Sequence, residues 1–538
     1  MPVLMQAATQ ILPPRPWRIR AALMLASAIG LLVICVLWAI LNAAANEPAA
    51  AFSRTDIAHL LRMTALQAGL STILSLIAGM ALAWCLNRLR FPGRDLVVGL
   101  FAAAIVTPGM VVAFGLLAIW GRNGWINRTA ESIFGTPIGN IAFGLGGILL
   151  AHVVLNGAFA ARVLLARLDA IPAARLKIGQ SLGLTTLQRF SIIDWPVMRG
   201  TLPGLGAIIF LLTFTSFPIV LLLGGGPGNQ TLEVAIYAAV RQDFDLRGAV
   251  WLALVQIAAC SLVILMASAV PPVPSSLGPS TGQSWRDRPL AQAGQWTLLA
   301  VFALGFAAPL LAVLADGVAA IPSVLGQQTF WRSMLTSLVI GSLSAFLTLA
   351  LALILSMGRA ASAHPFLRTM FGVPVYAYLA VPAVVLALGF FLLVRSFGIA
   401  PGNAAPVVVV IANALLALPF AAATLGPPLD AIPRTRGKLI RSLGLGGVSQ
   451  FGSIEYPLLG RDIGVVMALS FCFSLGDLGV IALFGTQDFQ TLPLMMYRAL
   501  GSYRTNDAAA VAAILLIMTI AAFVALPRLI ERLSHARD

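Results

Sequence analysis

The chain has 538 residues, of which 59% are hydrophobic and 10% are charged, and its formal net charge is +15. An ordinary soluble domain carries about 25% charged residues. This composition, with a mean hydropathy of +0.94, therefore excludes an ordinary soluble domain and indicates a membrane protein. The four cysteines lie inside apolar runs without metal-ligand spacing, so the sequence predicts neither a disulfide framework nor a metal site.

Apolar segments of about 20 residues, the length that crosses a hydrocarbon core of roughly 30 Å, recur along the chain. They are predicted near 21–42, 62–86, 96–120, 141–165, 203–224 and 248–270, and again near 294–317, 333–357, 371–394, 404–426, 462–485 and 508–530. Between the two sets, a Pro-, Ser- and Gly-rich stretch reads as a solvated linker. We therefore expect an all-α polytopic membrane protein with about twelve transmembrane helices, divided into a first half (1–270), a cytoplasmic linker (271–293) and a second half (294–538).

One charged segment is written twice. "LDAIPAARLKIGQSLGLTTLQRFSIIDWP" at 168–196 aligns without gaps to "LDAIPRTRGKLIRSLGLGGVSQFGSIEYP" at 429–457, 261 residues later, and 14 of the 29 positions are identical. The two lysines of the chain, Lys177 and Lys438, are partners in this repeat. Two polar loops, at 168–200 and 429–461, thus carry the same pattern.

The repeat extends beyond the loops. "PGMVVAFG" at 108–115 corresponds to "PAVVLALG" at 382–389, and "QTLEVAIY" at 230–237 corresponds to "QTLPLMMY" at 490–497. Because each half has an even number of predicted spans, both enter the membrane in the same direction. A pseudo-twofold axis along the membrane normal should then relate two parallel six-helix repeats, with a translocation path on that axis.

The distribution of basic residues predicts the orientation. Most lysines and arginines fall on one side of the predicted spans, the side that holds both termini, the linker and both repeated loops. Since Lys and Arg accumulate in cytoplasmic loops, we expect both termini and both loops to be cytoplasmic. This bias accounts for the net charge without a nucleic-acid partner.

The repeated loops have the local chemistry of two short helices joined by a turn. Pro172 suits a helix start, Gly183 and Gly444 suit a left-handed residue that ends a helix, and Thr185 or Thr186 can cap the helix that follows. In the second copy Gly446 and Gly447 replace the threonines, which should loosen its second helix. Such a loop is either a sturdy connector or a docking surface for a partner, and its duplication favours two copies of one partner.

These loops resemble the EAA loop of ABC-transporter permeases, through "AARLKIGQSLG" with "IIDWP" and "TRGKLIRSLG" with "SIEYP". The resemblance implies the type I ABC importer permease fold, a bacterial inner-membrane location and a separate cytoplasmic ATPase, present in two copies, that grips both loops and uses ATP and Mg. The chain has no Walker A motif, because neither lysine lies in G-K-[ST], so no enzymatic activity, catalytic residue or bound cofactor is expected. The implied coupling residues are Ala173, Ala174, Gly183, Asp194, Pro196, Arg436, Gly444, Glu455 and Pro457.

The stretches "FTSFPIVLLLGGGPGNQTLEVAIYAAVRQDFDL" and "SLGDLGVIALFG" are similar to those of permeases that import thiamine and thiamine pyrophosphate. That resemblance implies a periplasmic binding protein as the substrate donor. Ferric-iron importer permeases share the fused architecture and remain the alternative. A secondary transporter is a less favoured class, because it needs intramembrane coupling acids and one candidate is visible. A membrane enzyme has no constellation to support it.

Asp477 is the one acidic residue well inside a predicted span, which makes it a functional candidate. Thiamine carries a permanent positive charge on an aromatic ring, so a carboxylate with nearby aromatic rings suits it. The alternative is that Asp477 caps a break in its helix or pairs with an arginine. The substrate-path candidates are Ser216, Phe217, Phe473, Ser474 and Asp477. His152 on the fourth span is expected to make interhelical hydrogen bonds. The segment 231–246 is expected to form an amphipathic outer-face helix, which is a gate, part of the dock for the binding protein or, as we favour, a lid.

Overall fold

The computed structural model describes residues 16–46, 54–104, 106–139, 141–268, 285, 287–377 and 381–535. Within these ranges every regular element is helical. The long helices are α2 (Pro16–Asn46), α3 (Arg54–Arg88), α15 (Leu246–Ser268), α16 (Pro289–Leu325), α17 (Gln328–Ala361), α20 (Pro401–Ser442), α22 (Tyr456–Gly476) and α25 (Thr505–His535). Of the predicted linker, 271–284 and 286 lie outside the described residues, and α16 already begins at Pro289. The predicted all-α class is confirmed.

Shorter helices complete the described chain. They are α4 (Arg94–Ala103), α5 (Gly109–Trp120), α6 (Trp125–Phe134), α7 (Leu145–His152), α8 (Ala158–Asp169), α9 (Ala173–Ser181), α10 (Thr186–Arg189), α11 (Trp195–Arg199), α12 (Leu202–Phe214), α13 (Pro218–Leu223), α14 (Leu232–Arg241), α18 (Pro365–Ala377), α19 (Ala383–Ser396), α21 (Gly447–Gln450), α23 (Gly479–Phe484) and α24 (Leu492–Gly501). Helices α7 and α8 are joined by the π-helical turn η2 (Val153–Gly157), so that Leu145–Asp169 forms a single apolar span.

In the described part of the chain, ten helical segments are long and apolar enough to cross a membrane. The bent pair Thr186–Arg199 and Leu202–Phe214, which meet at 54°, raises this number to eleven if it counts as one span. The chain is therefore a multi-pass membrane protein. The sequence predicted about twelve transmembrane helices, and the described residues hold ten to eleven candidate spans together with the shorter apolar helix Ala383–Ser396.

The third and fifth predicted spans of both halves are the ones that break. The span expected near 203–224 is divided into α12 and α13, and the span near 371–394 into α18 and α19. Proline lacks an amide donor and favours the first turn of a helix. Pro218 accordingly starts α13, and Pro382 directly precedes α19. Apolar composition alone does not reveal such interruptions.

The first helix of each half packs against the other half. Helix α2 contacts α17 and α19, and α16 contacts α3 and α5, while each also packs on the last helix of its own half, α15 and α25 respectively. Two equivalent glycines of the repeated Pro-to-Gly motif permit these crossings. A Cβ on Gly389 would lie 2.3 Å from the Val36 side chain of α2, and a Cβ on Gly115 would lie 2.4 Å from the Pro309 carbonyl oxygen of α16. The motif is repeated because each copy receives the first helix of the opposite half.

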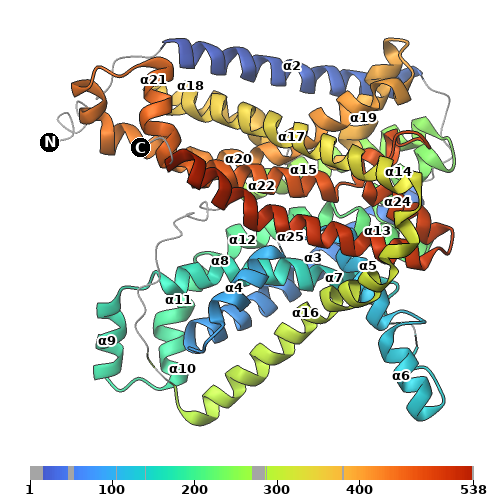
Figure 1. Cartoon of the computed structure of the whole chain (residues 1–538), viewed down its shortest axis with the longest axis horizontal. Helices are drawn as coiled ribbons and strands as arrows, with labels where there is room; N and C mark the ends of the chain where they lie inside the picture. Colours follow the sequence, from blue (N-terminus) through green and yellow to red (C-terminus); the bar gives the residue numbers. More distant parts are fainter. Residues whose placement is uncertain are drawn as a thin grey trace.

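Figure 1 shows two groups of helices that converge at one end and diverge at the other. Helices α5, α13, α14 and α24 gather at the convergent end, while α9 and α21 lie far apart at the divergent end. Helix α2 starts and α25 ends on the side of the divergent end (Figure 1). The two repeated loops therefore lie on the same side of the molecule as the start of α2 and the end of α25.

Equivalent hydrogen bonds recur in the two halves. The Leu232 amide, at the start of α14, donates to the Thr64 hydroxyl at 3.0 Å, and the Leu492 amide, at the start of α24, donates to the Ser337 hydroxyl at 2.8 Å. Each bond satisfies one of the free amides at a helix N-terminus. The same side-chain cap therefore joins the same two elements in each half, which supports the interpretation of the halves as two copies of one unit.

Candidate functional site

The first repeated loop forms the predicted helix, turn and helix. Helix α9 follows Pro172, and Gly183 adopts a left-handed conformation with φ of 63°. Thr185 then caps α10 in a capping box with Gln188, in which each side chain accepts a hydrogen bond from the backbone amide of the other. Local sequence chemistry is sufficient to specify this loop.

The second loop keeps the glycine turn but differs in the helices on both sides of it. Gly444 has φ of 62°, nearly the value of its partner, but α20 runs without interruption from the membrane span to Ser442. Gly446 precedes the four-residue helix α21 without a side-chain cap, as expected from the missing threonines. In both loops a π-helical turn follows, η3 (Phe190–Asp194) and η5 (Phe451–Glu455), and each ends at the acidic residue of the motif.

The acidic residues of the two motifs are buried inside this chain. Asp194 pairs with Arg88 of α3, and both side chains are 1% exposed. Glu455 accepts two hydrogen bonds from Arg18 of α2, at 2.8 and 2.9 Å, and a third from Gln450. Buried charges are retained when they are paired and hydrogen-bonded. Asp194 and Glu455 therefore act on any partner of the loops indirectly, through the position of the loop.

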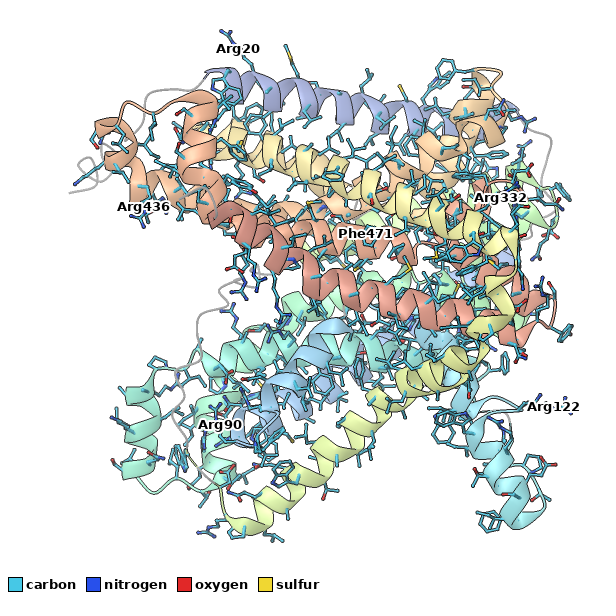
Figure 2. All side chains as sticks on the ribbon, viewed as in Figure 1. Arg20, Arg90, Arg122, Arg332, Arg436 and Phe471 are labelled. Atoms are coloured by element: carbon cyan, nitrogen blue, oxygen red, sulfur yellow. The ribbon has the colours of Figure 1, made fainter. Side chains whose placement is uncertain are left out.

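The other coupling residues expected from the sequence lie at or near the surface. Ala174, Gly183, Arg436 and Gly444 are exposed, whereas Ala173, Pro196 and Pro457 are partly buried. Pro196 and Pro457 occupy the first turns of α11 and α22, where proline is well tolerated. Figure 2 shows Arg436 at the divergent end, where Arg20 and Arg90 also lie, and shows Arg122 and Arg332 at the convergent end.

A second constellation lies where the fifth span of each half breaks. Ser216 stands between α12 and α13, and Asp477 stands at the equivalent place between α22 and α23. Both carboxylate oxygens of Asp477 accept backbone amides, from Val480 at 3.2 Å and from Ile481 at 3.4 Å. Asp477 thus caps α23, one of the two roles considered from the sequence, and it remains partly exposed.

Polar side chains at equivalent positions, His152 and Asn413, make buried hydrogen bonds near these breaks in the two halves. His152 of α7 is hydrogen-bonded to Ser71 at 2.8 Å and to Ser216 at 2.9 Å, which confirms its predicted interhelical role. Asn413 occupies the place of His152 in the second half, where it donates to the Ser474 hydroxyl at 2.9 Å. Ser474 in turn donates to Ser344 of α17 at 3.4 Å, so this buried chain of hydrogen bonds joins α17, α20 and α22.

His152→Asn is expected to lower the stability of the fold only slightly, because asparagine can still bond one of the two serine hydroxyl groups, as Asn413 bonds Ser474 in the second half. His152→Leu is expected to lower the free energy of unfolding by about 1–3 kcal/mol, since it removes the bonding partner of two buried hydroxyl groups. Thermal unfolding of the purified chain in detergent measures both effects. Equal midpoints for the wild type and the leucine variant would contradict the expectation.

The aromatic candidates differ in their surroundings. Phe217 is 1% exposed and packs edge-on against Tyr237 with ring centroids 5.4 Å apart. Tyr237 in turn meets Tyr497, its partner in the repeat, at 6.4 Å. A contact between two equivalent residues places that contact on the pseudo-twofold axis. Phe473 is partly buried and packs on Phe420, within the second half.

Glu233 is an acidic residue that sequence reasoning missed. It lies on α14, a short helix outside the candidate spans, and is 0% exposed. Gln256 donates to its Oε1 at 3.2 Å, while its Oε2 has no hydrogen-bond partner. Burial raises the pKa of Glu233 well above its usual range, the Gln256 bond opposes this, and the nearby charge of Asp477 raises it further. Because α14 was expected to be a lid on the outer surface, the sequence gave no reason to expect Glu233 to be buried.

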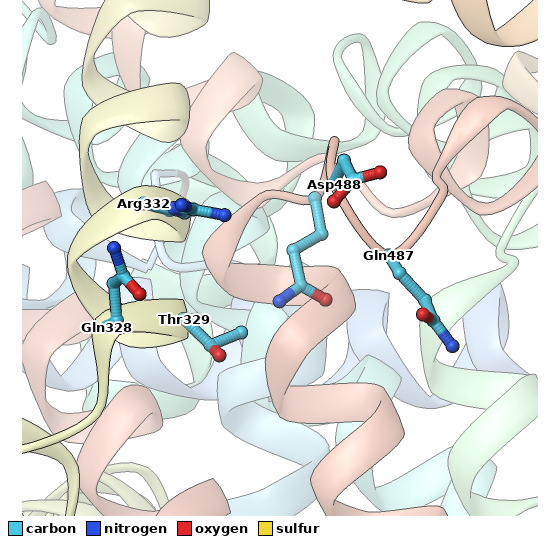
Figure 3. A pocket seen from close by; sticks show the side chains of 6 residues that line it. Gln328, Thr329, Arg332, Gln487 and Asp488 are labelled. Carbon is cyan, nitrogen blue, oxygen red and sulfur yellow. The ribbon is translucent and has the colours of Figure 1, made fainter.

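Figure 3 shows a small polar pocket, and Arg332, which lines it, lies at the convergent end of the molecule in Figure 2. Its lining residues are Gln328, Thr329, Arg332, Gln487, Asp488 and Gln490. Its volume is about 60 Å³, whereas pockets for drug-sized ligands have about 300–1,000 Å³. The pocket holds water-sized groups and is too small for an organic substrate in this conformation. In the described residues no group of three His, Cys, Asp or Glu side chains could hold a metal ion.

Comparison with known proteins identifies the chain as a permease of the ABC importer class. No family model matches the chain. It is similar to the thiamine transport system permease protein ThiP of Escherichia coli (strain K12), with 36% identity over 95% of both chains. It is also similar to ThiP of Brucella melitensis (37% identity, 88% of both chains) and to ThiP of Haemophilus influenzae (35% identity, 87% of this chain and 88% of the relative). The chain belongs to the family of thiamine transport system permease proteins.

Proposed function

We propose that this chain is the membrane permease subunit of an ATP-driven importer and forms the translocation path for thiamine and thiamine pyrophosphate. Identity of 35–37% with thiamine permeases along nearly the whole chain carries this proposal. The comparisons do not favour the ferric-iron alternative. The chain itself has no enzymatic role and binds no cofactor, and ATP and Mg are used by a separate subunit.

Two copies of a cytoplasmic ATPase dock on the two repeated loops, in this proposal. Both loops present large apolar side chains to solvent at the divergent end of the molecule. These are Ile178, Leu182 and Leu187 in the first loop and Leu439, Leu443 and Val448 in the second, all at least 43% exposed. Exposed apolar side chains on a polar loop mark a protein interface. The left-handed glycines hold the two faces in similar shapes.

The divergent end faces the cytoplasm in this proposal, with both termini, and the convergent end faces the periplasm of a bacterial inner membrane. The basic residues Arg20, Arg90 and Arg436 lie toward the divergent end (Figure 2), which agrees with the preference of Lys and Arg for the cytoplasmic side. A periplasmic binding protein then delivers substrate to the convergent end, and membrane lipid surrounds the spans.

We place the substrate path at the breaks of the two fifth spans. Asp477, partly exposed at one break, is the carboxylate proposed to attract the thiamine cation, with Ser216 at the equivalent break of the first half. Ser474 and Phe473 precede Asp477 on α22, and Phe217 adjoins Ser216. The charge of Asp477 raises the pKa of Glu233, so Glu233 is a second acidic group that this proposal includes as a candidate.

Uptake of labelled thiamine at nanomolar concentration tests the proposal. The host cells lack this chain and cannot synthesise thiamine, and the chain is restored together with its ATPase and binding protein. Uptake that returns with the chain and competes with unlabelled thiamine pyrophosphate is the expected result. Absence of uptake, with the assembled complex present in the membrane, would contradict the proposed substrate and leave the permease class intact.

A further inference from the structure

A short motif occurs at the entry to the first helix of each half. "WRIR" at 17–20 lies in the first turns of α2, and "WRDR" at 285–288 directly precedes α16. Both helices pack against the opposite half. The two motifs therefore lie at the start of the two helices that pack against the opposite half. Each motif also contacts one of the repeated loops.

The first motif holds the second loop. Arg18 forms a two-pronged pair with Glu455, with Nη1 to Oε1 at 2.8 Å and Nη2 to Oε2 at 2.9 Å. The side chains are 5% and 3% exposed. This fork geometry is the strongest form of an arginine–carboxylate contact and it fixes direction as well as distance. Residues 437 positions apart are thereby joined, one from each half.

The second motif holds the first loop. The Trp285 ring lies under the Arg189 guanidinium, 4.3 Å from its carbon, and the Trp285 carbonyl oxygen accepts a hydrogen bond from Arg189 at 2.9 Å. The ring also covers α9, because a Cβ on Gly179 would lie 2.8 Å from it. The absence of a side chain at Gly179 thus allows the Trp285 indole to lie against α9.

Asp287 completes the second contact. Its carboxylate accepts a hydrogen bond from Thr186 of α10 at 3.1 Å and another from Gln295 of α16 at 2.8 Å. It also lies 3.6 Å from Arg88, the arginine that pairs with Asp194. Arg88 thus interacts with two carboxylates, that of Asp194 in the first loop and that of Asp287 at the start of the second half.

The chemistry of the two contacts differs while their position is the same. In the first loop, Arg88 comes from the same half as Asp194. Aligning the halves through Ser71 and Ser344 places Ala361 opposite Arg88. The first loop therefore receives its guanidinium, that of Arg88, from its own half. The second loop receives its guanidinium, that of Arg18, from the other half.

We infer that the two W-R-x-R segments are straps, each tying the first helix of one half to the coupling loop of the other. The inference rests on the proposed function of these loops as ATPase contacts. Each moving unit then consists of one loop, the core helices of its own half and the first helix exchanged from the opposite half. Arg18, Trp285 and Asp287 are positioning residues, which transmit loop movement to the membrane helices.

Arg18→Gln is the primary test, performed on the complete importer reconstituted in proteoliposomes with its ATPase and binding protein. Transport per ATP hydrolysed is expected to fall about tenfold, because removal of one member of a buried pair strands the other. The complex is expected to copurify as before. Arg18→Lys keeps the charge without the fork, so its loss should be smaller.

Arg20→Gln is the matched control, since Arg20 belongs to the same motif and points away from the helices (Figure 2). It should transport like the wild type. A folded Arg18→Gln complex with wild-type transport per ATP would overturn the strap, as would an Arg18→Lys complex no better than the glutamine variant. Failure of the wild-type chain to bind the ATPase would instead contradict the proposed function.

Trp285→Ala provides a second variant, which keeps the hydrogen bond from Arg189 to the backbone oxygen of residue 285 and leaves the Arg18–Glu455 pair intact. It removes the ring that covers Gly179, and transport per ATP should fall several-fold with the same amount of assembled complex. Trp38→Ala, on the exposed face of α2, controls for loss of a tryptophan. Equal coupling in the Trp285 and Trp38 variants would show that the second segment does not act as a strap.

Discussion

Asp477→Asn is expected to reduce thiamine uptake about tenfold or more, which corresponds to a loss of about 1.4 kcal/mol of interaction with the cation. Asparagine caps helices as well as aspartate does. Its one carbonyl oxygen can still accept the Val480 amide, the shorter of the two bonds that hold α23 in place, whereas the bond from Ile481 is lost. The substitution therefore removes the charge of the side chain and retains part of its capping role. Labelled-thiamine uptake, normalised to the amount of chain in the membrane, measures the effect.

Asp477→Ala removes both the charge and the cap, so it serves as the comparison. Its stability should fall by about 1 kcal/mol, the usual cost of a lost N-cap, in addition to the loss of uptake. Wild-type uptake by the asparagine variant, with reduced stability of the alanine variant, would show that Asp477 is only a cap. Glu233→Gln preserves the Gln256 contact and tests whether the second acid also contributes to uptake.

Replacing both Gly183 and Gly444 with valine is expected to uncouple ATP hydrolysis from transport. Both glycines are left-handed, with φ of 63° and 62°, a conformation that is strained for a β-branched residue. Nothing lies within 4 Å of a Cβ added at either position. The expected loss of transport therefore comes from distortion of the turn and not from a steric clash with the helices.

The measurement is uptake and ATPase activity of the reconstituted importer, with copurification of the ATPase as a check on assembly. Gly446→Val is the matched control, because Gly446 lies in the second loop and has φ of −151°, which valine adopts readily. Normal transport and normal ATPase binding by the double variant would contradict the assignment of these turns to coupling. A defect of the same size in the Gly446→Val control would show that the added side-chain volume, and not the strained turn, causes the loss of transport.

The prediction of the loops succeeded because their signals are local. A helix cap, a left-handed glycine and a proline at a helix start depend on residues a few positions apart, so Gly183, Gly444 and Thr185 were found from the sequence. The roles proposed for them in ATPase docking remain predictions. The break before Pro218 was not predicted, because the residues on both sides of it together form one apolar segment that is long enough to cross a membrane.

The environment of the acidic residues was less predictable. Asp194 and Glu455 were expected on a docking surface, and the structure places them inside the chain, each paired with an arginine from another helix. Glu233 was not identified, since its helix has a polar side and reads as a surface element. Burial depends on which helix covers a side chain, and the covering helix lies far away in the sequence.

The sequence by itself determined the class of the protein, the duplication of its halves and the conformation of the turns, because hydropathy and local backbone preferences act over short distances along the chain. Only the tertiary structure decided that each first helix crosses to the opposite half and that Arg18 meets Glu455 across 437 residues. Close approach of helices depends on which small side chains face each other in three dimensions. An ion pair needs both partners placed within about 4 Å, which folding of the whole chain alone achieves.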